Sequence, residues 1–306
     1  MTKASLQAFA VCSFVIIALT NVLGQGIQPY PNAITDRVVR TETPMAPPPV
    51  NIVFNDPDLG SPIVRVSDET TNFRHPGGYL RSPAVWETNT WSADDSKFYF
   101  IGRGGNDFAF AFDPSTMATS SLPRATAGQA LLLPLRPGPT FSFIDPDLMY
   151  GTTNANRFTI SQYRFSTNKV APVIDTTTCG LQPPINTQNS KIQSDDDVSL
   201  SADDRRISIS EGGPQPGEDP FVVVYDQNLG CRWYNTQTGQ IGGQWGQTGF
   251  ATVPAGFLIN HAFLSGDGQH VKISALHFGF YIWDVATLNV VGCQTHTSHI
   301  ALVTET

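Results

Sequence analysis

The sequence predicts an all-β fold, a β-propeller built from antiparallel blades of about four strands each. The 306 residues include 23 prolines and 26 glycines but only 14% charged residues, a composition typical of short strands joined by many tight turns. No segment keeps an apolar period of about 3.6 residues, which disfavours amphipathic helices. A turn-and-strand pattern also recurs at intervals of 52 to 64 residues, and such a spacing is typical of a propeller or a solenoid.

The repeated unit is an apolar strand that runs into a Ser-x-Asp-Asp/Gly turn and continues as an alternating strand. The turn begins at Ser92, Ser201 and Ser265, and a fainter copy is aligned at Ile144. The short side chains of such a turn can hydrogen-bond the local backbone, which favours a tight reversal between two strands. We therefore expect each copy to join the first two strands of one blade.

A further apolar segment follows each turn and supplies the third strand of its blade. The predicted blades cover residues 80–122, 138–176, 194–243 and 257–292, each in round numbers. Closed propellers have about four to eight blades, so four is the lower end. Two explanations stay open: the chain is part of a larger, incomplete ring, or four blades close with help from leading strands near residues 50–54 and 63–66.

The first 24 residues have the order of a secretory signal peptide. Lys3 precedes an apolar run at residues 8–19, which is shorter than the about 20 residues that a membrane-spanning helix needs. We expect cleavage before Gln25, export to the periplasm or the extracellular space, and no integral membrane segment in the mature chain. Residues 25–49 are rich in proline and predict an extended linker, and the propeller then occupies residues 50–306.

The net charge and the cysteine spacing each exclude some classes of protein. The net charge is −8 and the isoelectric point about 5.1, which argues against the basic surface that a nucleic-acid-binding protein needs. After cleavage three cysteines remain, Cys179, Cys231 and Cys293, and their spacing fits neither a zinc site nor a disulfide-rich scaffold. We expect small buried residues with at most one disulfide, and a monomeric protein.

Two segments carry a resemblance to known propellers. Residues 280–287, FYIWDVAT, resemble the third strand of a WD-repeat blade, and the Ser-Ala-Asp-Asp and Ser-Gly-Asp-Gly turns resemble the Ser-Pro-Asp-Gly turn of TolB-type propellers. The Gly-His pair of WD repeats is missing, which favours the exported bacterial group. The resemblance covers about residues 50–292 and implies the fold, whereas the superfamily includes scaffolds, binding proteins and lyases.

A narrower resemblance concerns the end of the chain. Residues 294–299, QTHTSH, are similar to the histidine-bearing segments of oligogalacturonate lyase propellers, although their spacing departs from that pattern. That family holds a divalent metal with clustered histidine and glutamine. The resemblance therefore implies a candidate site for Mn²⁺ or Ca²⁺ at Gln294, His296 and His299, while the sequence itself firmly implies no cofactor.

The other candidate site is the mouth of the propeller channel. Residues four or five positions before each Ser-x-Asp turn should meet there, together with the loops between second and third strands. The ligand-binding candidates are Glu87, Arg103, Asp196, Asp197, Asn260, His261 and His277. Converging carboxylates and imidazoles can bind a divalent ion or act as acid and base on an acidic sugar, but polar side chains also line a propeller channel that binds nothing.

The leading hypothesis is an exported, non-catalytic β-propeller that presents a loop face to a carbohydrate or protein partner. No Gly-x-Ser-x-Gly nucleophile motif is present, which favours binding over catalysis without deciding between them. One alternative is a metal-assisted polysaccharide lyase of the oligogalacturonate type, suggested by His261, His277 and the segment 294–299. The other is a truncated propeller without independent activity.

Overall fold

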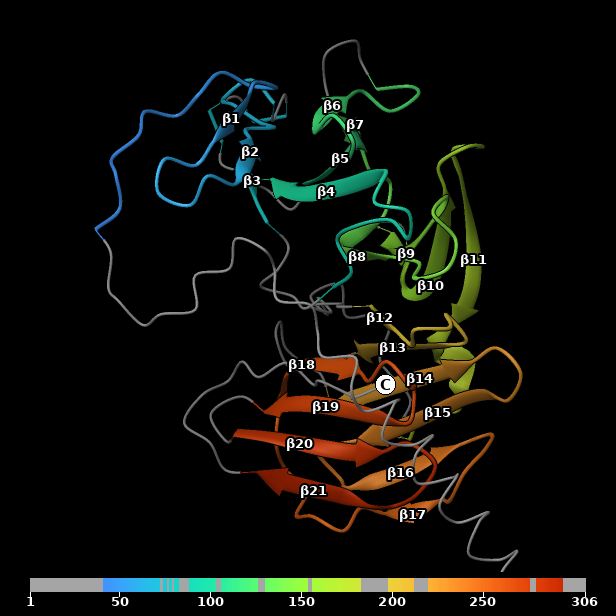
Figure 1. The fold of residues 1–306 in the computed structure, drawn as a ribbon. Helices are drawn as coiled ribbons and strands as arrows, with labels where there is room; N and C mark the ends of the chain where they lie inside the picture. Colours follow the sequence, from blue (N-terminus) through green and yellow to red (C-terminus); the bar gives the residue numbers. More distant parts are fainter. Residues whose placement is uncertain are drawn as a thin grey trace, which may run out of the picture. The chain divides into compact units, whose positions relative to one another are not determined.

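The computed structural model shown in Figure 1 describes residues 41–71, 74–75, 77–78, 80–82, 88–102, 106–125, 130–153, 156–182, 198–211, 220–275 and 279–293. The described secondary structure consists of β-strands and one 3₁₀ turn, η2 (Thr176–Cys179), which confirms the predicted all-β class. The chain divides into two compact units, one of residues 1–47 and 54–63 and one of residues 48–53 and 64–306. No helix of the described residues is long and apolar enough to cross a membrane.

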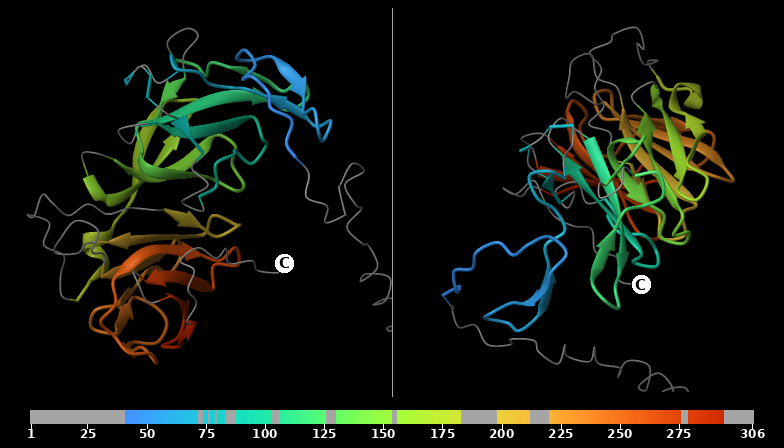
Figure 2. Two further views of the ribbon diagram at one scale, coloured as in Figure 1. Left: turned by 90° about the vertical axis from the view of Figure 1, so that its left-hand side faces the viewer. Right: turned by 90° about the horizontal axis from the view of Figure 1, so that it is seen from above.

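Four antiparallel sheets follow one another in the second unit and form the blades of a four-bladed β-propeller (Figures 1 and 2). Blade 1 contains β3 (Leu80–Arg81), β4 (Lys97–Gly102), β5 (Asn106–Asp113) and β6 (Ala118–Ser120), and β7 (Leu131–Leu132) also pairs with β5. Blade 2 contains β8 (Arg136–Phe141), β9 (Leu148–Thr153), β10 (Asn156–Arg164) and β11 (Lys169–Asp175).

Blade 3 is the widest sheet of the described chain. It contains β12 (Ser199–Leu200), β13 (Arg206–Glu211), β14 (Phe221–Asp226), β15 (Gly230–Asn235), β16 (Gln240–Gly243) and β17 (Gly249–Phe250). Blade 4 contains β18 (Ile259–Leu264), β19 (His270–Ala275), β20 (Gly279–Asp284) and β21 (Val290–Cys293). Contacts of β5 with β8, and of β12 and β13 with β18, join successive blades.

A short hairpin precedes the blades, as the sequence predicts. β1 (Val53–Asn55) pairs with β2 (Pro62–Val64), and the carboxylate of Asp56 accepts hydrogen bonds from the backbone N–H groups of Asp58 (2.9 Å) and Leu59 (2.7 Å) in the turn. Among the described strands this hairpin forms a sheet of its own. The expectation that leading strands complete the last blade is therefore not met in the described chain, because blade 4 takes its strands from residues 259–293.

One hydrogen-bonded turn joins the first two strands of blades 1, 3 and 4. In each copy a serine hydroxyl donates to the aspartate two positions later and accepts the backbone N–H five positions later. The Oγ–Oδ1 distances are 2.8 Å for Ser92 and Asp94, 2.6 Å for Ser201 and Asp203, and 2.5 Å for Ser265 and Asp267. The next residue has a positive φ, 57° at Asp95, 56° at Asp204 and 69° at Gly268, which Asp and Gly tolerate better than most residues. The repeat Ser-x-Asp-Asp/Gly follows from this geometry.

Blade 2 has a longer version of the turn that begins at Ser142. The hydroxyl of Ser142 accepts N–H groups from Ile144 (3.1 Å) and Asp145 (2.7 Å), and its own N–H bonds the carbonyl of Leu148. In the other blades the corresponding bond spans five positions, as from Ser92 to Lys97. The sequence alignment at Ile144 was therefore wrong: the turn begins two residues earlier, at Ser142, and is one residue longer than in the other blades.

Apolar side chains fill the spaces between successive blades. Tyr99 and Phe141 pack in the core between blades 1 and 2. Another apolar cluster, which includes Val224 and Val271, joins blade 3 to blade 4. β14 shows why its sequence is a continuous apolar run: Phe221 and Val223 belong to the core shared with blade 2, and Val222 and Val224 to the core shared with blade 4. A strand that is buried on both faces has no polar alternation.

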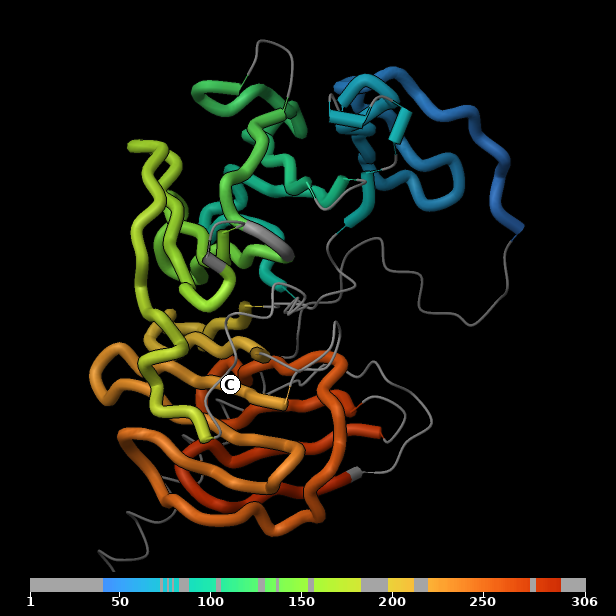
Figure 3. Tube along the Cα trace, turned by 180° about the vertical axis from the view of Figure 1, so that it is seen from behind, coloured from blue at the N-terminus to red at the C-terminus, as the bar shows by residue number. Residues whose placement is uncertain are grey.

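A disulfide strengthens the junction between blades 2 and 3. The chain leaves β11, passes through η2 and runs beside the strands of blade 3 (Figure 3). Cys179 at the end of η2 is bonded to Cys231 in β15, with the Cα atoms 5.4 Å apart and 52 positions between them in the sequence. Both side chains are buried. The sequence allowed at most one disulfide, and the structure identifies the pair.

Replacing both Cys179 and Cys231 by alanine should lower the free energy of unfolding by about 3–4 kcal/mol, because the bond closes a loop of 52 residues. Urea titration of the oxidised wild type and of the double variant measures the difference. The wild type titrated with a thiol reductant serves as the control and should lose a similar amount. A double variant as stable as the oxidised wild type would contradict a stabilising role.

Candidate functional site

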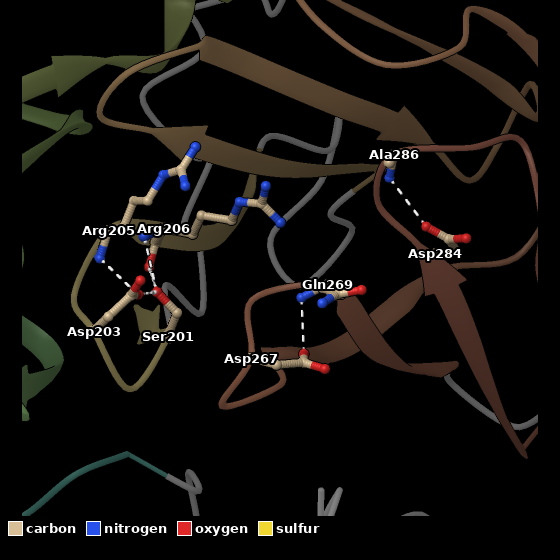
Figure 4. A pocket seen from close by; sticks show the side chains of 8 residues that line it. All are labelled: Ser201, Asp203, Arg205, Arg206, Asp267, Gln269, Asp284 and Ala286. Carbon is tan, nitrogen blue, oxygen red and sulfur yellow. Dashed lines mark hydrogen bonds between the residues drawn. The ribbon is translucent and has the colours of Figure 1, made fainter. Parts of the chain in front are cut away.

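A pocket of about 270 Å³ lies at the Ser-x-Asp turns of blades 3 and 4 (Figure 4). The turn between β12 and β13, the turn between β18 and β19, and the end of β20 contribute its lining. The residues are Ser201, Asp203, Arg205, Arg206, Asp267, Gln269, Asp284 and Ala286. Three carboxylates and two guanidinium groups therefore meet around one small cavity.

Local backbone hydrogen bonds fix the three carboxylates. Each accepts the N–H two positions later, at 3.1 Å for Asp203, 2.9 Å for Asp267 and 3.2 Å for Asp284. The hydroxyl of Ser201 lowers the pKa of Asp203, and that of Ser265 lowers the pKa of Asp267. Asp203 and Asp267 are therefore negatively charged at neutral pH, each on a turn whose hydrogen bonds hold it in place.

The two arginines converge on Asp226, the last residue of β14. The Asp226 side chain is fully buried, and it binds Arg206 Nε at 2.8 Å and Arg205 Nε and Nη2, both at 3.2 Å. Burial raises the pKa of Asp226, but the hydrogen bonds from Arg206, the N–H of Asn228 and Arg205 outweigh it, so the net pKa is lowered. The buried carboxylate is charged and satisfied at neutral pH.

The two arginines differ in how far their side chains are exposed to solvent. Arg206 also donates to the carbonyl of Gly268 at 2.6 Å, and its guanidinium carbon lies 4.9 Å from the ring centre of Trp245. Only 17% of the Arg206 side chain is exposed, whereas 42% of Arg205 is exposed. Arg206 thus joins blade 3 to blade 4, and Arg205 is the cation that a ligand in the pocket can reach.

The turn of blade 3 also binds blade 2, through Asp204. Its carboxylate accepts the hydroxyl of Ser142 and, at 2.9 Å, the N–H of Phe143. Burial is the largest influence on the pKa of Asp204 and raises it, against the two hydrogen bonds. This contact places the blade 2 turn directly beside the residues that flank Asp204, namely Asp203 and Arg205, which line the pocket.

Two large apolar side chains project from the blade 2 turn. Phe143 is 44% exposed and Ile144 is 64% exposed, although both types are usually buried. We call the turns at residues 142–147, 201–206 and 265–270 the turn surface. On it Asp204 connects an exposed apolar pair with the turn that lines the charged pocket.

The turn surface is not where the sequence placed the site. Of the residues predicted at the channel mouth, the structure describes Asn260 and His261, both in β18. His261 is 7% exposed, and its ring lies 5.9 Å from that of Phe263. Four positions at about 3.3 Å per residue separate His261 from Ser265, so the predicted mouth and the turn surface are about 13 Å apart along the strand.

The remaining predicted site residues lie outside the described residues. They are Glu87, Arg103, Asp196, Asp197 and His277 at the channel mouth, and Gln294, His296 and His299 in the metal-binding candidate. Their convergence stays a prediction. Within the described ranges, no three His, Cys, Asp or Glu side chains form a group that could hold a metal ion.

One sequence signal could have pointed to the turn surface. The third strands of blades 1, 3 and 4 end in an aspartate, at Asp113, Asp226 and Asp284. In blade 3 this aspartate pairs directly with Arg206 across the sheet. An aspartate at a strand end opposite a double arginine therefore indicates an ion pair once the strand register is known.

Replacing Asp226 by asparagine should lower the free energy of unfolding at pH 7 by about 2–3 kcal/mol, because two arginines lose a charged partner. Since the folded pKa is lowered, the stabilisation is present above the ordinary carboxyl pKa of about 3.9 and disappears as the pH falls through the folded value. Urea titrations at pH 7 and near pH 2 should thus show a difference between variant and wild type that shrinks in acid.

The matched control is Asp113→Asn, at the same strand position in blade 1. The carboxylate of Asp113 is exposed and bonds Ser115 and Thr116. This change should leave the unfolding free energy nearly unchanged at both pH values. An Asp226 variant whose deficit is the same at pH 7 and near pH 2 would rule out the charged pair as its cause.

Comparisons with known proteins found similar solved structures but no matching family. No family model and no curated protein match its sequence. Similar solved structures are TolB from Acinetobacter baumannii (16% identity, TM-score 0.41, 77% of this chain and 46% of that chain) and oligogalacturonate lyase from Vibrio parahaemolyticus (12%, 0.40, 78% and 58%). Another is the β-propeller domain of Swd1 from Myceliophteria thermophila (11%, 0.37, 67% and 57%). The chain spans about half the length of these proteins.

Proposed function

We propose that this protein is an exported, non-catalytic binding module that holds a protein partner at its turn surface. The observation that supports the proposal best is the exposed pair Phe143 and Ile144 beside a pocket that presents Arg205 and Asp267. Protein interfaces combine an apolar anchor with surrounding polar groups, and aromatic residues and arginine are enriched in them. Export itself rests on the signal peptide predicted at residues 1–24.

The groups offered to the partner are held before it binds. The backbone of Phe143 is fixed by Asp204 at 2.9 Å, and the guanidinium of Arg205 is fixed by Asp226 at 3.2 Å. Side chains that are already ordered lose less entropy on association, which favours affinity. The turn surface therefore has the properties of a prepared interface, although its turns also serve to join the blades.

Charge favours a polypeptide over a carbohydrate at this surface. Asp203 and Asp267 are ionised, and Arg205 is partly exposed, so the pocket matches a segment with side chains of both signs. The indole of Trp245, which could otherwise stack on a sugar ring, is covered by Arg206 at 4.9 Å. The lyase alternative depends on His261, His277 and residues 294–299, of which the structure describes His261, and no observation among the described residues favours it.

Replacing Phe143 and Ile144 together by serine, or Arg205 by glutamate, should weaken partner binding by at least about tenfold, since removing interface anchors costs more than about 1.4 kcal/mol. The wild type and variants are immobilised at equal density, and each candidate from a protein extract of the source organism is then purified and titrated. Arg206 is left intact because its loss would also separate the blades.

The control variant is Phe250→Ser, which removes an equally large side chain that is 71% exposed in β17, outside the turn surface. It should bind like the wild type. A partner that binds the serine pair and the Arg205 variant as tightly as the wild type, with all variants folded by circular dichroism, would refute the proposed interface.

A further inference from the structure

A second pocket, also of about 270 Å³, lies on blade 1, away from the turn surface. Residues from the segments 50–51 and 66–71 form one wall, and β5, β6, Ser121 and Ala130 form the other; all these lining residues belong to the second unit. Hydroxyl groups of threonine and serine dominate its lining, together with one carboxylate and one carboxamide. No residue of the described lining is Lys, Arg or His.

One carboxylate oxygen of Asp68 accepts hydrogen bonds within its own turn, and the other does not. Oδ1 accepts the N–H of Thr70 (2.8 Å), the hydroxyl of Thr70 (2.7 Å) and that of Thr71 (3.3 Å). These bonds, with the Thr70 hydroxyl first, lower the pKa of Asp68, so it is ionised at neutral pH. Oδ2 makes no hydrogen bond among the described residues and is an acceptor held in a fixed orientation at the pocket.

The carboxamide of Asn51 is fixed in a similar way. Its backbone N–H bonds the carbonyl of Arg65 at 2.8 Å, and its φ of 60° is a conformation that asparagine tolerates. Its Oδ1 accepts the hydroxyl of Thr119 from β6. The amide nitrogen is thereby left as a donor, and the neighbouring Ser120 adds a hydroxyl that can donate or accept.

The base of the pocket is apolar. Phe110 and Ala130 are buried and line it. The ring of Phe110 is held by stacking on Phe98 (centroids 5.4 Å apart, 14° between planes) and by an edge contact with Phe100 at 6.0 Å. The pocket thus combines a rigid apolar base with a donor, an acceptor and hydroxyls around it.

We propose that this pocket binds a neutral monosaccharide. A hexose offers adjacent hydroxyls that can donate to Asp68 and accept from Asn51, while its C–H face can contact the apolar base. The charge of Asp68 without a neighbouring cation in the described lining disfavours anionic sugars. The volume is just below the about 300–1,000 Å³ of pockets for drug-sized ligands, which suits one sugar ring rather than a chain.

The test is titration of the purified full-length protein with D-glucose, D-galactose, D-mannose and D-galacturonate, followed by calorimetry and by amide chemical shifts. At least one neutral hexose should bind saturably, and more tightly than galacturonate. Asp68→Asn should weaken that binding by about tenfold, a typical effect of losing one hydrogen bond to a charged group. Asparagine keeps the Oδ1 acceptor for Thr70, so the local turn is retained.

Two further variants separate recognition from structure. Ser120→Ala removes a hydroxyl on the strand surface and should weaken binding by a few-fold, while Asp113→Asn, a similar turn aspartate on the same blade, should bind like the wild type. Saturation by none of the hexoses, tighter binding of galacturonate, or equal affinity in the Asp68 and Asp113 variants would each overturn the proposal. Since this pocket and the turn surface share no residue, either proposal can fail without the other.

Discussion

The turn between β12 and β13 is the constraint on which the other features of the described propeller depend, since it binds the blade on each side. Asp204 holds the blade 2 turn through Ser142 and Phe143. On the other side Arg206 reaches the carbonyl of Gly268, and the N–H of Ala202 bonds the carbonyl of Gly266 at 2.7 Å. Residues 201–206 therefore make hydrogen bonds to the blades on both sides. These bonds are directional, whereas the apolar contacts between the blades are not.

These contacts explain why the exposed groups lie where they do. Phe143 is presented to solvent because its backbone is held by blade 3, and Arg205 is oriented because it shares Asp226 with Arg206. A buried ion pair contributes little net stability relative to apolar packing, yet breaking one side of it is costly. The position of the turn surface is therefore fixed by contacts whose first role is to set one blade against the next.

The sequence predicted the features that depend on local bonds and missed those that depend on register. The Ser-x-Asp turns were recognisable because every partner lies within five residues, as with Ser201 and Arg206. The blade 2 turn was misaligned because it is one residue longer and its serine, Ser142, bonds Asp204 of the next blade where the other serines bond an aspartate of their own turn. The Cys179–Cys231 pair joins residues 52 positions apart and the Arg206–Asp226 pair residues 20 positions apart, and spacing alone carries no information about either pair. The channel mouth, predicted from the same register, lies mostly outside the described residues.

The two buried aspartates of blade 3 respond to acid in opposite directions. Burial raises the pKa of Asp204, so the folded protein takes up a proton before the unfolded chain does, and this contribution to stability grows as the pH falls through the raised value. The pKa of Asp226 is lowered, so its contribution persists to below the ordinary carboxyl pKa and is then lost. Protonation of Asp204 therefore relieves the cost of burying its charge but weakens the hydrogen bonds that it accepts from Ser142 and Phe143, whereas protonation of Asp226 weakens the contact that orients both arginines. Arg205 is thus oriented by a carboxylate whose charged form is favoured by folding, while Phe143 is held by a carboxylate whose charged form is disfavoured by burial.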